Sequence, residues 1–312
     1  MQAQGRFTHA PHEWSDAAMS TSTQSREQIV AEAISGISHI ATLPEITLRI
    51  IELVEDPRST AHDLHQVISN DPALCSRILK VVNSAFYGLP GQIGSINRAI
   101  VLLGLNAVKN IAIAASLAKL FRGGELCPVF SARDLWKHSI ATAAASKLIA
   151  DEVKLGLPDE AFLGGLIHDI GVMVEMQHNR HKLIEVFDGL EVDKDGAPVK
   201  DMLEVEEQVF GATHQDFGKG LCAEWKFPKS FGYVTGHHHN PLDLAEEHRT
   251  LACVVHVADR IAAQQSLGFR LDVHNTDISS EVMGEIHLSP EGLSRVLSEL
   301  PEHLEAVESL LS

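Results

Sequence analysis

Hydrophobic positions recur at three- to four-residue spacing along most of the chain, which predicts helices from near Arg26 onward. Ser95 is placed to cap a helix that runs through Leu103, and Gly104 is placed to end it. An amphipathic pattern over residues 290–311 predicts a final helix. No alternation typical of a strand is sustained, so the predicted fold class is all-α.

Breaks in this pattern divide the chain into parts. Residues 1–26 are polar and rich in Ser, Thr and Gln, and we expect them to form a flexible lead-in. Glycine and proline within residues 122–128 indicate a linker between two helical halves. We therefore predict helical subdomains over 27–125 and 130–268, followed by a C-terminal loop and helix over 269–312.

Histidine and aspartate residues interrupt the hydrophobic faces of several predicted helices in the second half. His138 falls inside an apolar stripe, and His168 and Asp169 lie on apolar faces of the next predicted helix. His214 and Asp259 align with apolar positions in two later segments. Burying a lone carboxylate costs several kcal/mol unless it is paired or coordinated. The pattern therefore predicts that these side chains share one site.

A divalent metal would offset the cost of burial, because neutral imidazole and carboxylate are common metal ligands. The run GHHHNP over residues 236–241 places further imidazoles at a predicted helix end. Gly164, Gly165 and Gly171 remove side chains where we expect neighbouring helices to come close. The alternative interpretation is that the adjacent His-Asp pair is buried and hydrogen-bonded without metal.

The order of these residues resembles the signature of the HD metal-dependent phosphohydrolase superfamily: His138, His168-Asp169 within GLIHDIG, His214, His238-His239 and Asp259. More narrowly, the first half resembles the HDOD family, an HD-related output domain of bacterial signalling, in ISHIATLPEI, SNDPALCSRILKVVNSAFYG and IGSINRAIVLLGLNAVKNIAI. In the second half, LWKHSIATAAASKLIA and EEQVFGATHQDFGKGLCAEWKFP fit in order and spacing. The resemblance covers residues 28–265.

This resemblance implies an N-terminal HDOD helical bundle packed on an HD-like bundle that holds one or two divalent ions (Fe, Mn, Zn or Mg). The implied metal ligands are His138, His168, Asp169, His214, His238, His239 and Asp259. If the site is catalytic, Asp169 and Lys137 are the candidate catalytic residues. The chain departs from the related cyclic-dinucleotide phosphodiesterases at Val172, where they have lysine, and at residues 240–243, where they have a Gly-Tyr-Pro signature.

Charge and composition narrow the expected partners. With 42 acidic and 25 basic residues the net charge is -17, which disfavours binding to nucleic acid or to anionic membranes. The N-terminus lacks the features of a signal peptide, and polar residues interrupt the apolar stretch 100–121, so we expect a cytoplasmic protein. The four cysteines are far apart, which favours reduced thiols over disulfides or a zinc ribbon.

Two functions remain open at this point. The first is a regulatory protein of bacterial signal transduction, whose HDOD half binds signalling proteins and whose HD-like half is structural or binds a nucleotide-type ligand. The second is a metal-dependent phosphohydrolase, a phosphodiesterase that acts on a nucleotide or cyclic dinucleotide. Nucleic-acid binding is a weaker third hypothesis, and the sequence does not fix the oligomeric state.

Overall fold

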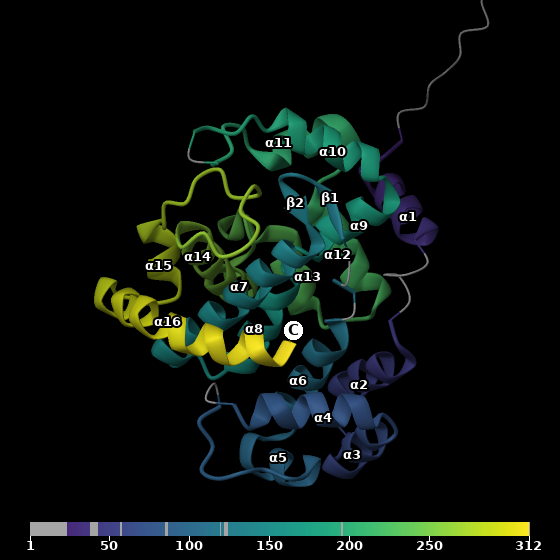
Figure 1. Ribbon diagram of the computed structural model, residues 1–312, viewed down its shortest axis with the longest axis vertical. Helices are drawn as coiled ribbons and strands as arrows, with labels where there is room; N and C mark the ends of the chain where they lie inside the picture. Colours follow the sequence, from purple (N-terminus) through teal and green to yellow (C-terminus); the bar gives the residue numbers. More distant parts are fainter. Residues whose placement is uncertain are drawn as a thin grey trace, which may run out of the picture.

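The computed structural model (Figure 1) describes residues 24–37, 43–56, 58–84, 87–118, 120–121, 124–194 and 196–311. The predicted flexible lead-in, except for its last three residues, lies outside these ranges. Helices dominate the described residues, so the all-α fold class is confirmed. Among the described helices, none combines the length and the apolar composition that crossing a bilayer requires.

The N-terminal half is a bundle of short helices at the bottom of Figure 1: α2 (Glu45–Glu55), α3 (Ala61–Ser69), α4 (Pro72–Val82), α5 (Ile96–Leu103) and α6 (Leu105–Leu117). Side-chain caps set the starts of α3, α4 and α5, because a capping oxygen satisfies a free backbone N–H. The Ser95 hydroxyl accepts from Arg98 N, and Asp71 accepts from Leu74 N beside Pro72. Gly104, with φ 92°, separates α5 from α6, as predicted.

The second half forms the upper part of the molecule. Its helices are α7 (Ala132–Glu152), α8 (Pro158–Ile167), α9 (Ile170–His178), α10 (Arg180–Gly189), α11 (Met202–Phe210), α12 (His214–Glu224), α13 (Lys229–His237), the short 3-10 helix η1 (Pro241–Asp243) and α14 (Glu246–Gln264). Two further helices follow, α15 (Ser280–Glu285) and α16 (Pro290–Leu311). The first helix, α1 (Arg26–Gly36), packs on α9 and α12 of this half.

A small antiparallel hairpin begins in the predicted linker with β1 (Glu125–Cys127) and ends just beyond it with β2 (Phe130–Ser131). The side chain of Phe130 anchors it, since its ring stacks on Phe187 at 4.9 Å between centroids and meets Phe269 edge-on. Strands of this length are too short to show the alternation that predicts a strand. The hairpin is therefore an addition that the sequence pattern did not reveal.

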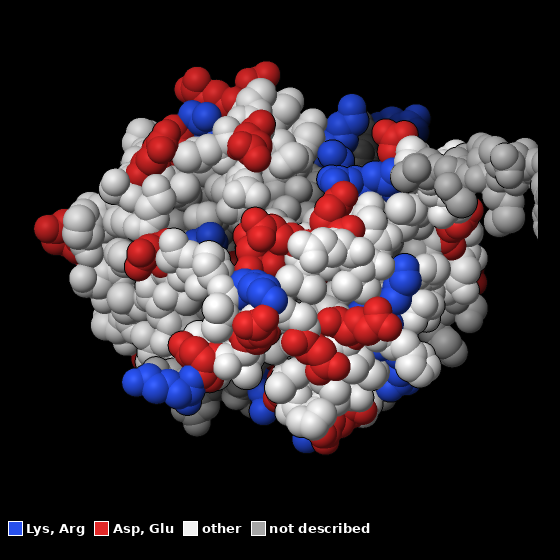
Figure 2. Space-filling view, turned by 90° about the horizontal axis from the view of Figure 1, so that it is seen from above, with Lys and Arg blue, Asp and Glu red and all other residues white. Residues whose placement is uncertain are grey.

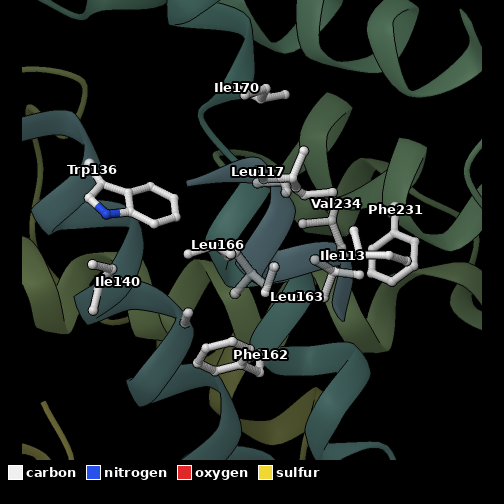
Figure 3. Packing of buried hydrophobic residues seen from close by; sticks show 14 of the residues in the cluster. Ile113, Leu117, Trp136, Ile140, Phe162, Leu163, Leu166, Ile170, Phe231 and Val234 are labelled. Atoms are coloured by element: carbon white, nitrogen blue, oxygen red, sulfur yellow. The ribbon is translucent and has the colours of Figure 1, made fainter. Parts of the chain in front are cut away.

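One hydrophobic core joins the two halves. Figure 3 shows Ile113 and Leu117 of α6 beside Leu163 and Leu166 of α8, with Val234 of α13 close by. These side chains are almost fully buried. The N-terminal bundle is thus packed on the second half through α6, which agrees with the predicted architecture. Packing on several sides fixes α7, which carries His138, α8, which ends beside His168, and α14, which carries Asp259.

Charged side chains of both signs share the molecular surface. Figure 2 shows the face that carries α10 and α11, with Asp and Glu spread over it and Lys and Arg between them. On this face Lys and Arg gather at the upper right of Figure 2, with acidic side chains beside them, and elsewhere the two signs are interspersed.

Candidate metal centre

The structure brings all seven predicted ligands into one pocket. They come from α7 (His138), the junction of α8 and α9 (His168, Asp169), the start of α12 (His214), the segment after α13 (His238, His239) and α14 (Asp259). Six of these residues are fully buried, with 0% exposure, and His239 is partly exposed. Side chains from separated segments thus lie together and buried, as predicted, and their role as metal ligands stays a prediction.

The backbone at His168 and Asp169 differs from the prediction of one continuous helix. Helix α8 ends at Ile167 and α9 begins at Ile170, and Asp169 has φ -95° and ψ 15°. On a regular helix, adjacent side chains point about 100° apart. The break lets the neighbouring imidazole and carboxylate face the same pocket, which explains why the sequence interrupts a helix there.

Two of the three glycines around this break allow close helix contacts. A Cβ on Gly171 would lie 1.8 Å from the His214 carbonyl oxygen, and one on Gly165 would lie 2.8 Å from the Thr142 carbonyl oxygen. A Cβ on Gly164, in contrast, would meet its nearest neighbour at an ordinary 3.6 Å. The predicted need for glycine therefore holds at positions 165 and 171, and it is wrong at position 164.

The first group of donor atoms surrounds the inner end of the pocket. His138 Nε2 lies 3.2 Å from His168 Nε2 and 3.1 Å from Asp259 Oδ1. His168 Nε2 lies 3.3 Å from Asp169 Oδ2. Asp272, in the connection after α14, joins the group, since its carboxylate lies within 4.8 Å of the donor atoms of His138, His168 and Asp169. The sequence analysis did not identify Asp272.

The second group lies on the other side of Asp169. His214 Nε2 is 3.0 Å from His239 Nε2 and 3.4 Å from His238 Nε2. His238 Nε2 is 3.3 Å from Asp169 Oδ1. The two oxygens of Asp169 therefore face different groups: Oδ2 faces the first and Oδ1 the second. Asp169 could therefore supply one oxygen to an ion in either group.

The donor set fits divalent metal. Two ligand atoms on one ion, each at about 2.0–2.2 Å, are about 3.0–3.5 Å apart, which matches most of these separations. Among the described residues, neither oxygen of Asp169, Asp259 or Asp272 has a hydrogen-bond partner. Three buried carboxylates without hydrogen bonds repel one another and lack solvation. Cations between them would offset both costs, so these residues could hold one or two divalent ions.

The family profile of the HDOD domain matches residues 40–241, which is more than half of the chain. The chain belongs to the HDOD domain family. Its fold is similar to that of an HDOD domain protein of unknown function from Geobacter sulfurreducens, with TM-score 0.75 and 24% identity over 91% of this chain and 98% of that one. A protein from Shewanella amazonensis SB2B that is designated a phosphohydrolase has TM-score 0.71 and 22% identity, with the same coverage.

A curated relative extends beyond the region that it shares with this HDOD chain. It is an uncharacterized protein of Treponema pallidum (strain Nichols), 23% identical over 237 residues, which is 74% of this chain and 44% of the relative. The chain therefore spans less than half the length of that protein.

In this HDOD domain, hydrogen bonds orient the imidazoles toward the pocket. His168 Nδ1 lies 2.7 Å from the Gly165 carbonyl oxygen, and His238 Nδ1 lies 3.2 Å from that of Val234. Donation from Nδ1 to a carbonyl leaves the Nε2 lone pair free for a metal. The histidines are thus held as ligands before any ion binds.

A buried carboxylate supports His214 in the same way. Glu206 of α11 lies 2.9 Å from His214 Nδ1 and also accepts the backbone N–H of His214 at 2.9 Å. Burial, followed by the charge of Glu206, raises the pKa of the neighbouring Glu175 well above its usual value. Sequence analysis missed Glu206, although it shares a helix face with the buried Met202 and Phe210.

The pocket changes the pKa values of its groups in opposite directions. Burial would raise the pKa of Asp169, but the imidazoles of His168 and His238 outweigh burial and hold that pKa well below its usual value. Burial would lower the pKa of His214, but Glu206 outweighs it and raises the pKa to about 9. Burial lowers the pKa of His238 to about 4. At neutral pH, His238 is ready to bind metal, whereas His214 must first release a proton.

Two positions bear on the catalytic hypothesis. The Lys137 side chain is 51% exposed and lies 3.6 Å from Asp134, so it is placed at the surface rather than among the buried donors. Its assignment as a candidate catalytic residue gains no support from this placement. Val172 is fully buried in the core, so the position where related phosphodiesterases carry lysine here contributes an apolar contact.

We expect Glu206→Gln to weaken metal binding by about 10- to 100-fold, the usual effect of removing a partner that orients a ligating histidine. The amide of glutamine lacks the negative charge by which Glu206 makes the His214 imidazole a stronger electron-pair donor to a metal. Competition with a metal-sensitive chelating dye measures the affinity. Glu207→Gln is the matched control, because Glu207 is exposed and pairs with Arg26 at 2.6 Å. Equal affinities in the two variants would contradict the role assigned to Glu206.

Proposed function

We propose that this chain is a regulatory HDOD protein that holds two divalent ions in its HD-like half and acts by binding a partner protein or a nucleotide-type ligand. The observation that supports it best is the position of Asp169, whose two oxygens face two separate groups of donor atoms. His138, His168, Asp259 and Asp272 would hold one ion, and His214, His238 and His239 the other. We also propose that the protein is cytoplasmic, in keeping with the expected reduced thiols.

Burial of the site favours binding over turnover. Six of the seven predicted ligands have no exposed surface, and His239 is the member that reaches solvent. A bound ion can polarise an oxygen of a ligand or lower the pKa of a water. In so buried a site, the chain's own residues mainly orient the imidazoles and exclude water. This arrangement suits a ligand that is bound rather than converted.

Phosphohydrolysis of a nucleotide or cyclic dinucleotide is the second candidate. A bridging carboxylate between two groups of donors is typical of two-metal sites, where the ions are about 3.5–4 Å apart and clamp a phosphoryl group. The retained donor set favours this activity. The buried Val172 in place of lysine argues against it, and for that reason we rank it second.

Metal analysis of the loaded protein tests the main proposal. Protein exposed to Mn, Fe or Zn and then desalted should retain about two equivalents per chain by elemental analysis. Retention of no transition metal at all would contradict the proposal. The same sample, assayed with cyclic dinucleotides and nucleotides, separates the candidates, because turnover at about 1 s⁻¹ or faster would establish the enzyme.

A further inference from the structure

A cation lies at the edge of the donor cluster. Arg260 follows Asp259 on α14, and its Nη1 is 3.8 Å from Asp259 Oδ2. Burial lowers the pKa of Arg260, while the charges of Asp259 and Asp272 act in the opposite direction. A guanidinium keeps its proton in proteins, so Arg260 brings a fixed positive charge to the pocket.

Most hydrogen-bonding capacity of Arg260 is unused. A guanidinium has five N–H donors, and Arg260 makes one hydrogen bond within the described part of the chain, from Nη1 to the His256 carbonyl oxygen at 3.4 Å. An arginine that serves only to neutralise a carboxylate forms short, often paired hydrogen bonds to it. The 3.8 Å separation from Asp259 is longer than that. Arg260 therefore retains donors for another group.

Arg260 and His239 are the members of this cluster that keep some exposed surface. The Arg260 side chain is 12% exposed and His239 is partly exposed, whereas the other predicted ligands are fully buried. Arg260 therefore offers N–H donors that solvent can reach, next to the fully buried carboxylate of Asp259.

The charge of the loaded pocket favours an anion. Two divalent ions bring four positive charges, and the carboxylates of Asp169, Asp259 and Asp272 remove three of them. Arg260 then leaves the site with a clear positive excess. In a partly desolvated pocket such an excess acts strongly on a charged ligand, because water screens it less.

We propose that Arg260 is the anion-binding residue of this site and that it contacts a phosphate group of the ligand. The inference rests on the proposed metal centre. The planar N–H donors of Arg260 match two oxygens of a phosphate group. Arg260 is thus assigned to ligand recognition rather than to holding metal.

Titration calorimetry of inorganic phosphate binding to the metal-loaded protein tests this assignment. We expect Arg260→Gln to bind phosphate about 10- to 100-fold more weakly than the parent at equal metal content. The phosphate affinity of Arg260→Lys should lie between those of the parent and Arg260→Gln, since lysine keeps the positive charge but lacks the planar pair of N–H donors. Arg249→Gln is the control on the same helix, because Arg249 pairs with Glu285 at 2.6 Å outside the pocket; it should bind like the parent.

Elemental analysis of each sample separates the possible failures. Equal phosphate affinity in Arg260→Gln and the parent, both fully loaded, overturns the assignment. So does a loaded parent that binds no phosphate at millimolar concentration. Loss of metal from both Arg260 variants, with the Arg249 control still loaded, would make Arg260 a support for the ligands instead. A parent that retains no metal contradicts the metal centre itself.

Discussion

Asp169→Asn is expected to abolish retention of the two ions proposed for this site. Asp169 offers one oxygen to each donor group, so the substitution removes a charged ligand from both sites at once. Loss of a partner outside the coordination shell already costs about 10- to 100-fold in affinity. Loss of a bridging ligand should exceed the upper end of that range for each ion. Elemental analysis after desalting measures the outcome.

Thermal stability gives a second readout for the same variant. An ion that binds only the folded state stabilises it by about 2.7 kcal/mol when present at 100 times its dissociation constant. Metal should therefore raise the melting temperature of the parent and leave that of Asp169→Asn nearly unchanged. Asp151→Asn, at an exposed carboxylate that lies 2.7 Å from the mostly buried Lys147 and outside the donor groups, should respond like the parent. Two retained ions in Asp169→Asn would show that the metal lies elsewhere.

Local signals in the sequence were enough to predict much of the helical fold. Ser95 caps the helix that ends at Leu103, and the amphipathic stripe of residues 290–311 forms one helix, as expected. The β1–β2 hairpin and α15 were not predicted. Both are shorter than the window over which hydrophobic periodicity can be read, and packing of Phe130 rather than local preference holds the hairpin.

The site was predictable where polar residues interrupt an apolar helix face, as at His138 and Asp259. By that logic Glu206 could also have been found, since it lies between buried residues on its helix. Asp272 could not, because it belongs to an irregular connection in which no period distinguishes inward from outward positions. The helix break at His168–Asp169 was missed for another reason: each residue alone is compatible with a helix, and only the shared pocket requires the turn.

Gly171→Ala is expected to destabilise the fold by about 3 kcal/mol or more, the upper range for overpacking a core. Its Cβ would lie 1.8 Å from the His214 carbonyl oxygen and 2.9 Å from Gly218 N. These are backbone atoms, so no change of rotamer can make room, and α9 and α12 must separate. Urea denaturation measures the loss. Because His214 begins α12, surviving folded protein should also bind metal more weakly.

A second glycine provides the matched control for this argument. Gly232 lies inside α13, and a Cβ there would meet nothing within 4 Å. Gly232→Ala should therefore be neutral or stabilise the protein by up to about 1 kcal/mol through helix propensity, with metal binding unchanged. If Gly171→Ala were as stable as Gly232→Ala, α9 and α12 could not pack as closely as described. The close packing of α9 and α12 would then no longer explain why His214 lies near Asp169 in the second donor group.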